Sequence, residues 1–406
     1  MKKYEVGGAV RDALLGLPVV ERDWVVVGAE PKELLALGYK QVGRDFPVFL
    51  DPVSHEEHAL ARTERKVGPG YKGFSFDTST TVTLEDDLRR RDLTINALAR
   101  DEHGTIIDPY NGRADIAARI LRHVSPAFRE DPLRVLRTAR FAARFKELGF
   151  TIAPETLELM RAIVDDDELE ALSAERVWQE TEKGLATPRP DVYFETLRAC
   201  GALAHVFPEI EKLFGVPQPE RWHPEIDTGV HTLMALKLSA SLSGDIAVRF
   251  AVLVHDLGKG ETPRLLWPKH HGHGARSIAI IDRLSERLPV PNRFRTLAIR
   301  VARYHDHVHR AAELRPGTIL EVLEDVDGLR PPGTALEAFL IACEADARGR
   351  AGLEASPYPQ AEMLRRAQRA ALSINASTVQ DGALEGPRLG EAIRQARIAA
   401  IARALH

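Results

Sequence analysis

Two stretches near the amino terminus decide the predicted fold: residues 4–15 read YEVGGAVRDALL, and residues 21–27 read ERDWVVV. The first predicts a short strand, a tight turn at Gly7-Gly8 and then a helix. Free N–H groups at a helix start face the preceding turn, and glycine lets an anion approach closely, so the pattern is typical of a phosphate site. Arg11 would add a second phosphate contact. A plain tight turn explains the glycine pair equally well.

The second stretch places two carboxylates, Glu21 and Asp23, before an apolar run. Side chains at positions i and i+2 of a strand project to the same face, so this pair is able to hold a divalent metal beside a phosphate. For an isolated pair the better interpretation is a solvent-facing strand start, but the glycine turn and Arg11 lie close by in the sequence. Glu57, in a segment that also reads as a strand, is a candidate third acid, and a polar strand face explains it equally well.

The surrounding sequence indicates the domain organisation. Up to about residue 110, short apolar stretches alternate with Gly and Pro turns, which predicts an α/β domain. From about Pro126 the helical pattern becomes long, so the remainder is predicted to be mostly α. The segment 66–73, KVGPGYKG, is predicted to be a loop. We expect four domains or regions along the chain, namely residues 1–125, 126–220, 221–335 and 336–406.

Composition excludes several classes. With 44% hydrophobic and 28% charged residues, the 406-residue chain is neither disordered nor fibrous. No apolar run approaches the roughly 18 residues of a membrane span, and we expect a cytoplasmic protein. Its only two cysteines, Cys200 and Cys343, cannot build a disulfide framework and lack the paired spacing of a zinc site. Because the net charge is −4, binding of nucleic acid would need local basic patches.

Histidines mark a third region, because nine of the 15 lie between His223 and His309. His231 is followed by His255-Asp256, which comes directly after the apolar run FAVLV. A single histidine is more often structural than a ligand, but an ordered set that includes a carboxylate favours a metal site. The same region and the segment after it supply further candidates, namely Lys259, His270, His271, His273, His305, Asp306 and Asp346.

Four motifs resemble those of a known family. GGAVRD (residues 7–12), ERD (21–23), RRDLTINAL (90–98) and EDPLRVLRTARF (130–141) occur in the order and spacing of class II tRNA nucleotidyltransferases. The chain as a whole is most similar to the bacterial multifunctional CCA-adding enzymes that carry an HD domain. The resemblance implies an α/β nucleotidyltransferase head of the DNA polymerase beta-like superfamily, followed by an all-α neck and body and an α-helical HD domain.

The resemblance also implies roles for residues of the head. Glu21 and Asp23 would hold Mg²⁺ for a two-metal transfer of nucleotides from CTP and ATP to the 3′-hydroxyl of tRNA. The family usually has Asp at both positions, and Glu at 21 reaches one methylene further. Gly8, Arg11 and Arg91 would bind the nucleotide. A purely structural explanation of RRD is a helix start with Asp92 as its N-cap.

Nucleotide choice is attributed to the EDPLR motif. Cytosine and adenine share an exocyclic amine beside a ring-nitrogen acceptor, so a carboxylate and an arginine about one helical turn apart would accept both and reject uracil and guanine. Asp131 and Arg134 have that spacing, and in the resembled family these positions act as a protein template. Arg137 and Arg140 extend a basic stripe along the same helix, and the neighbouring motifs favour contact of both residues with phosphate or nucleotide over a solvated face. Asp131 before a proline is also a good helix N-cap, which needs no function.

For the histidine region, the resemblance implies metal binding by His231, His255 and Asp256, with Asp346 as a tentative late ligand. Catalysis at His255 and Asp256 would use Ni²⁺ or another divalent transition metal. The implied activities are 2′,3′-cyclic phosphodiesterase, 2′-nucleotidase and phosphatase. A tRNA end that carries a cyclic phosphate or a 2′-phosphate cannot be extended, which makes this pairing of domains sensible.

Three other functions fit parts of the sequence. A bacterial poly(A) polymerase shares the head motifs, but it usually lacks the HD signature and carries a basic tail. A nucleotide-signalling phosphohydrolase would not need the carboxylates of the head. The absence of aromatic stacking clusters, with only 6% aromatic residues, and of a long basic tract weighs against a non-catalytic RNA-binding module. We expect a monomer or homodimer that binds the tRNA acceptor arm by its shape and phosphates. The basic patches available for this are residues 62–66, 89–91 and 134–144, together with Arg394, Arg397 and Arg403.

Overall fold

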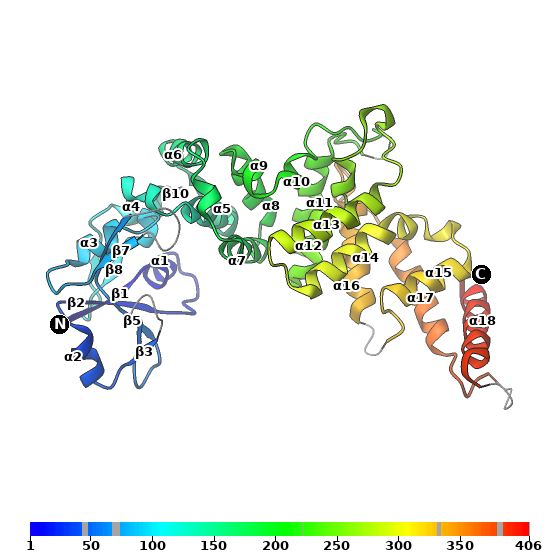
Figure 1. Cartoon of the computed structure of the whole chain (residues 1–406), viewed down its shortest axis with the longest axis horizontal. Helices are drawn as coiled ribbons and strands as arrows, with labels where there is room; N and C mark the ends of the chain where they lie inside the picture. The colour runs from blue at the N-terminus through cyan, green and yellow to red at the C-terminus, as the bar shows by residue number, and fades with distance from the viewer. Residues whose placement is uncertain (43–47, 67–73, 222, 331–333, 380–384, 406) are drawn as a thin grey trace. The chain divides into compact units, whose positions relative to one another are not determined.

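The computed structural model describes residues 1–42, 48–66, 74–221, 223–330, 334–379 and 385–405, and the part of the KVGPGYKG segment after residue 66 lies outside them. The chain forms two compact units (Figure 1). Unit 1 consists of Met1–Glu180 with Thr196–Val206, and unit 2 consists of Thr181–Glu195 with Phe207–His406. Strands are concentrated in the first part of unit 1 and helices make up the rest, so the predicted order of an α/β head followed by helical regions is confirmed.

Unit 1 begins with a seven-stranded sheet in the order β3-β4-β5-β2-β1-β8-β9. β2 pairs in parallel with β5, and the other neighbours in this sheet are antiparallel. The strands are β1 (Lys2–Val6), β2 (Asp23–Val27), β3 (Lys40–Val42), β4 (Val48–Leu50), β5 (Glu57–Leu60), β8 (Ala99–Arg100) and β9 (Ile106–Ile107). β6 (Thr63–Lys66) and β7 (Phe74–Asp77) form a separate antiparallel pair, and β10 (Ile120–Leu121) pairs with β11 (Thr151–Ile152). The helices of this part are α1 (Gly8–Leu14), α2 (Pro31–Ala36), α3 (Leu84–Arg89) and α4 (Gly112–Ala118).

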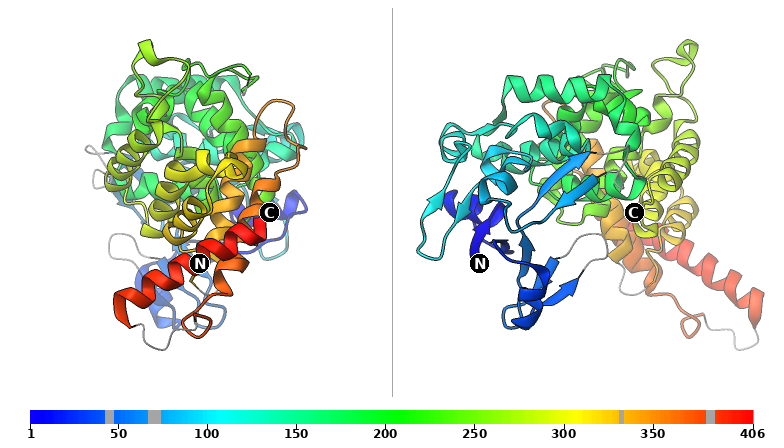
Figure 2. Two further views of the ribbon diagram at one scale, coloured as in Figure 1. Left: turned by 90° about the vertical axis from the view of Figure 1, so that its right-hand side faces the viewer. Right: turned by 60° about the vertical axis from the view of Figure 1, so that its left-hand side comes forward.

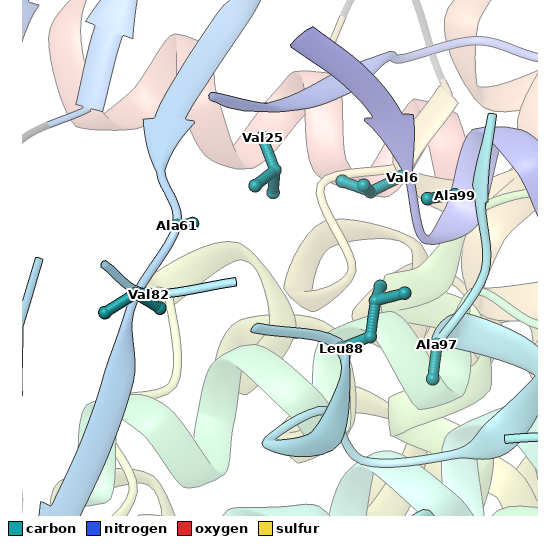
Figure 3. Close-up of a cluster of buried hydrophobic side chains, with 7 residues drawn as sticks. All are labelled: Val6, Val25, Ala61, Val82, Leu88, Ala97 and Ala99. Carbon is teal, nitrogen blue, oxygen red and sulfur yellow. The ribbon is translucent and has the colours of Figure 1, made fainter. Parts of the chain in front are cut away.

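Both faces of the sheet carry an apolar cluster. Successive strand residues point to opposite faces, so neighbouring residues of one strand enter different clusters. Val25 belongs to one apolar cluster and Val26 to another. Figure 3 shows the first cluster, which consists of Val6, Val25, Ala61, Val82, Leu88, Ala97 and Ala99. The second consists of Val26, Ala29, Leu34, Tyr39, Phe49 and Leu60. The core of the head therefore lies on both sides of the sheet.

Helices follow the sheet in unit 1. They are α5 (Leu133–Phe145), α6 (Pro154–Asp165), α7 (Ala174–Leu185), α8 (Pro190–Ala199) and α9 (Ala202–Val206). The end of α7 and the start of α8 belong to unit 2. α5 has Pro132 as its N-cap, one residue later than the Asp131 cap that the sequence predicts. The carboxylate of Asp131 still accepts a hydrogen bond from the N–H of Leu133 at 3.1 Å, so it still satisfies a free donor of the first turn.

In unit 2, α11, α12, α14 and α16 pack against one another, and α13 packs on α14. The C-terminal α18 lies along α17 (Figure 2). The helices are α10 (Pro208–Glu211), α11 (Thr228–Leu242), α12 (Ile246–Val254), α13 (His273–Arg287), α14 (Asn292–His309), α15 (Pro316–Asp325), α16 (Thr334–Arg348), α17 (Pro359–Leu372) and α18 (Gly386–Leu405). Among the described residues, no helix combines the length and the apolar character that a membrane crossing requires.

Candidate active sites

One edge of the head sheet gathers the predicted nucleotide-binding residues. The register pairs Asp23 of β2 with Val6 of antiparallel β1 and with Glu57 of parallel β5. The start of β2 therefore lies beside the glycine turn that follows β1, and the candidate third acid is a strand neighbour of Asp23. β2 begins at Asp23, so Glu21 precedes the strand and the same-face argument does not place it.

The carboxylate of Asp23 sits in an unfavourable electrostatic setting. Burial raises its pKa above the ordinary value, the Arg91 guanidinium opposes that shift, and the Glu21 carboxylate adds to it. A bound cation would therefore stabilise the ionised form of the Asp23 carboxylate. The donors are hard oxygens, the kind that Mg²⁺ binds in proteins.

The glycine turn is shaped around Arg91. Gly7 has φ +70°, and a Cβ there would lie 2.6 Å from Nη1 of Arg91. Arg91 is held in this position by the carboxylate of Asp87, 3.3 Å from its Nη2. The positive φ therefore favours glycine at this position, and a larger residue would also push the Arg91 guanidinium out of its place. Gly8 then opens α1.

Arg11 is only 3% exposed, and its guanidinium is surrounded by side chains of the protein. Its Nε donates to Oδ1 of Asp12 at 2.8 Å, and its Nη1 donates to the side-chain oxygen of Asn96. The guanidinium lies over the rings of Phe141 and Phe145, with 5.2 and 5.1 Å to the ring centroids. These contacts join α1 to α5, and the phosphate contact predicted for Arg11 stays a prediction.

The basic stripe of α5 is paired with acids from three parts of unit 1. Arg137 donates to Oδ2 of Asp92 at 2.8 Å, and Arg140 donates to Oε2 of Glu180 at 2.6 Å. Arg144 donates to Asp12 at 2.9 Å. The stripe is therefore a set of ion pairs that fixes the helix to the head and to α7.

The predicted base-reading pair also has partners within the protein. Arg134 is 6% exposed, and it donates to the carbonyl oxygens of Ala127, at 2.7 Å, and of Arg90. The carboxylate of Asp131 accepts from Arg176 of α7 at 2.9 Å. Sequence reasoning missed Arg176, whose only signal was a charged position on an amphipathic helix. To read a base, Asp131 would accept at a lone pair that Arg176 does not use, and Arg134 would donate from an N–H that the carbonyl oxygens do not use. Otherwise the base would replace these contacts.

Unit 2 brings together most of the ordered histidine set. His231 of α11 lies with its Nε2 2.9 Å from Oδ1 of Asp346 on α16, although 115 positions separate them. The Nε2 of His255, at the end of α12, is 3.3 Å from Asp256 and 3.5 Å from Asp346. The ligand atoms of His231, His255 and Asp346 all lie within 4.8 Å of one another, and all three residues are buried. The tentative late ligand therefore lies next to two predicted ligands.

His255 is oriented for metal binding. Its Nδ1 donates to the carbonyl oxygen of Val252 at 2.7 Å, so Nε2 is the ring nitrogen that faces the cluster. Burial alone would lower the pKa of His255, but the carboxylates of Asp256 and Asp346 raise it well above the ordinary value. Among the described residues, His255 Nε2 and Asp256 Oδ1 are buried without a well-aligned hydrogen bond. A divalent cation satisfies both atoms and compensates the carboxylates, so these residues fit a metal.

A second group of donors adjoins the first. His273, at the start of α13, has its Nε2 3.3 Å from Oδ1 of Asp256 and 3.2 Å from Nε2 of His305. Asp306 lies 3.7 Å from the same nitrogen of His273. His309 donates to Asp346 at 2.6 Å, and burial lowers the pKa of His305 to about 4.

An open cavity of about 780 Å³ gives access to this region. Its walls include the ligand candidates His273 and Asp306 and cationic side chains such as Lys259, Lys269 and Arg350. The Nζ of Lys259 is 2.6 Å from Oδ2 of Asp256, which places an ammonium beside the metal candidates. Positive charge around a metal cluster suits an anionic substrate such as a phosphate ester.

The fold and the two sites define a nucleotidyltransferase head joined to a helical, HD-type metal domain. Profiles described as "Poly A polymerase head domain", "Probable RNA and SrmB- binding site of polymerase A" and "HD domain" match residues 3–122, 149–214 and 228–348. The multifunctional CCA protein of Thioalkalivibrio sulfidiphilus is 60% identical over 401 residues, covering 99% of this chain and 98% of that protein. That of Nitrosococcus oceani is 59% identical over 406 residues, covering 100% and 99%. The chain therefore belongs to the family of multifunctional CCA proteins.

Solved structures agree with this assignment. The Bacillus stearothermophilus CCA-adding enzyme in complex with CTP is 26% identical, with a TM-score of 0.60 over 99% of this chain and 89% of that chain. The Thermotoga maritima CCA-adding enzyme complexed with tRNA shares the fold at 18% identity, with a TM-score of 0.63 over 100% and 90%. The predicted resemblance and fold class are confirmed.

Proposed function

We propose that unit 1 adds cytidine, cytidine and adenosine in turn to the 3′ end of tRNA, using CTP and ATP without a nucleic-acid template. In each step the 3′-oxygen of the RNA forms a bond to the α-phosphorus of the nucleotide, and the bond to pyrophosphate breaks. The observation that carries this proposal is the edge of the sheet where Asp23, Glu57, the Gly7 turn and Arg91 meet. The membership of the chain in its family supports it.

Asp23 and Glu21 would hold Mg²⁺ at this edge. Bound there, the metal supplies positive charge to the attacking hydroxyl and the leaving pyrophosphate. The Gly7-Gly8 turn lets phosphate oxygens approach the backbone, and the Arg91 guanidinium beside it donates hydrogen bonds to them. Glu57, one strand away from Asp23, either completes the ligand set or orients its water.

Base choice would rest on Asp131 and Arg134. The carboxylate accepts from the exocyclic amine that cytosine and adenine share, and the guanidinium donates to their ring nitrogen. Uracil and guanine present a carbonyl where cytosine and adenine have the amine, and an N–H in place of the ring-nitrogen acceptor. The Asp131 carboxylate would then face a carbonyl oxygen, and the Arg134 guanidinium would face an N–H donor. Arg176 fixes the Asp131 carboxylate by a 2.9 Å contact, so it acts as a positioning residue.

For unit 2 we propose hydrolysis of phosphate esters at RNA ends, with 2′,3′-cyclic phosphates and 2′-phosphates as substrates. His231, His255, Asp256 and Asp346 would hold Ni²⁺ or another divalent transition metal, which activates water when bound. Lys259 would contact the phosphate from the cavity wall. Clearing a blocked 3′ end would make that end available to the head.

A matched pair of isosteric variants tests both assignments. Asp23→Asn removes a carboxylate charge from the head, and Asp256→Asn removes one from unit 2. Asp23→Asn should abolish extension of a tRNA that lacks CCA and leave hydrolysis of adenosine 2′,3′-cyclic phosphate intact, and Asp256→Asn should do the reverse. Circular dichroism checks that both variants are folded. Loss of both activities in either folded variant would contradict two separate sites.

A further inference from the structure

The two oxygens of the Asp346 carboxylate face different neighbours. Oδ1 lies 2.9 Å from Nε2 of His231 and 3.5 Å from Nε2 of His255, on the side of the proposed metal ligands. Oδ2 lies 2.6 Å from Nε2 of His309. Among the described residues, His309 belongs to none of the groups of three donors that converge, so its contact with Asp346 is a hydrogen bond within the protein. One oxygen is thus tied to the protein, and the other is directed at the metal ligands.

The contacts of His309 fix which of its ring nitrogens carries the proton. An ionised carboxylate only accepts, so Nε2 of His309 donates to Asp346, and Nδ1 of the neutral ring presents a lone pair. The hydroxyl oxygen of Tyr358 lies 3.0 Å from that Nδ1. Burial raises the pKa of Tyr358 above its ordinary value, so the hydroxyl keeps its proton and donates it. Tyr358 therefore donates to His309, and His309 donates to Asp346.

Three separate helices of unit 2 supply this series of hydrogen bonds. Asp346 lies on α16, His309 is the last residue of α14, and Tyr358 is the N-cap of α17. The rings of His309 and Tyr358 meet edge to face with their centroids 6.0 Å apart. Gln360 of α17 also donates to the carbonyl oxygen of His309 at 3.3 Å. These two contacts hold the start of α17 against α14 independently of the hydroxyl, so removing the hydroxyl alone tests its role.

We propose that Tyr358 and His309 are positioning residues for the metal site of unit 2, and that by donating in series they hold Asp346 with Oδ1 toward the ion. A carboxylate that is already held in one orientation loses less conformational freedom when it binds a metal. Removing a group that is hydrogen-bonded to a metal ligand typically weakens metal binding by about 10- to 100-fold. The inference rests on the proposed binding of metal by Asp346, and it concerns affinity, which is measured without turnover.

The test is the affinity of the metal-free, full-length chain for Zn²⁺, measured by competition with a fluorescent chelator. A large excess of Mg²⁺ occupies the carboxylate site of the head. Tyr358→Phe should weaken Zn²⁺ binding by about 10-fold and His309→Leu by about 10- to 100-fold, whereas His309→Gln keeps a donor and an acceptor and should recover part of the loss. The matched control is Tyr304→Phe, which removes a hydroxyl that donates to Asp325 at 2.5 Å and should leave the affinity unchanged.

A second readout on the wild-type chain covers the case in which a variant does not fold. In the Zn²⁺-loaded protein with ¹⁵N-labelled histidines, nuclear magnetic resonance should show a proton on Nε2 of His309 and none on Nδ1. A proton on Nδ1, an Nε2 bound to Zn²⁺, or equal affinities of wild type and folded Tyr358→Phe would overturn the proposal. Failure of the wild-type chain to bind Zn²⁺ would instead refute the metal site itself, so failure of this inference and failure of the proposed function are distinguishable.

Discussion

Replacing Arg137 with alanine tests how α5 is held against the head. Nε and Nη2 of Arg137 both lie 2.8 Å from Oδ2 of Asp92. The Asp92 side chain is 6% exposed, and its other oxygen already accepts from the N–H of Leu93 and from Asn96. Arg137→Ala would therefore leave a buried carboxylate without its cationic partner.

The magnitude follows from this burial. Breaking a fully buried ion pair by removing one partner costs about 3–5 kcal/mol, whereas exposed pairs contribute about 0–1 kcal/mol. Arg137 is 34% exposed, and Asp92 keeps two other hydrogen bonds, so the cost lies between these two ranges. We expect a loss of about 2–3 kcal/mol, which corresponds to a roughly 30- to 150-fold change in the local opening equilibrium.

Amide hydrogen exchange measured by mass spectrometry gives this number locally, which matters because a chain of two units need not unfold in a single step. Peptides from α5 and from residues 92–98 should exchange faster in Arg137→Ala by that factor. The matched control is Arg129→Ala, which breaks an ion pair with Asp166 whose side chains are 43% and 56% exposed. Equal effects of the two variants would refute the reasoning.

The same pair gives a pH prediction. Burial opposes ionisation of Asp92, but the Arg137 guanidinium and hydrogen bonds outweigh it and hold the pKa of Asp92 well below the ordinary value. A carboxylate with a lowered folded pKa stabilises the protein above its unfolded pKa, about 3.9, and loses that contribution as the pH falls. The stability gap between wild type and Arg137→Ala should therefore be full near neutrality, begin to narrow below about pH 4 and shrink further as the pH falls toward the lowered pKa of folded Asp92. A gap independent of pH would show that charge is not its cause.

Three further outcomes are expected. Gly258→Ala would place a Cβ 2.1 Å from the carbonyl oxygen of His273, so hydrolysis assays should show loss of activity with nucleotide addition retained, whereas Gly244→Ala, with open space around it, should change neither. Arg176→Ala should release Asp131 and raise UMP misincorporation relative to CMP in single-turnover extension, and an unchanged ratio would remove Arg176 from base choice. After chelation, Mg²⁺ should restore extension, whereas Ni²⁺ or Co²⁺, but not Mg²⁺, should restore hydrolysis; restoration of both by Mg²⁺ alone would contradict the difference in donor sets.

Much of the head site could be predicted because its signals are local. The glycine pair directly follows one short strand, and Asp23 and Glu57 each begin another. The sheet register brings these three strand ends together. The exact strand start could not be predicted, so the sequence placed Glu21 on the strand, whereas β2 begins at Asp23. Strand boundaries depend on pairing with neighbours that the local pattern does not contain.

The residues that sequence reasoning missed have distant partners. Arg176 pairs with a carboxylate 45 positions away, and Glu180 accepts from Arg140 across 40. On a helix each looks like any solvent-facing charge, and only the folded chain brings them to Asp131 and Arg140. His309 is different, because it follows His305 by four residues and so shares its helix face. That spacing was a usable signal for its 2.6 Å contact with Asp346.

The most direct test of the central claim is extension of a tRNA that lacks its 3′ CCA, with CTP and ATP supplied separately and together with Mg²⁺, at single-nucleotide resolution. We predict two additions with CTP alone and a stop after C, C and A with both nucleotides. A long ladder of adenosines would instead indicate a poly(A) polymerase. No extension by folded protein would contradict the assignment of the head and leave only the metal site of unit 2 as an active centre.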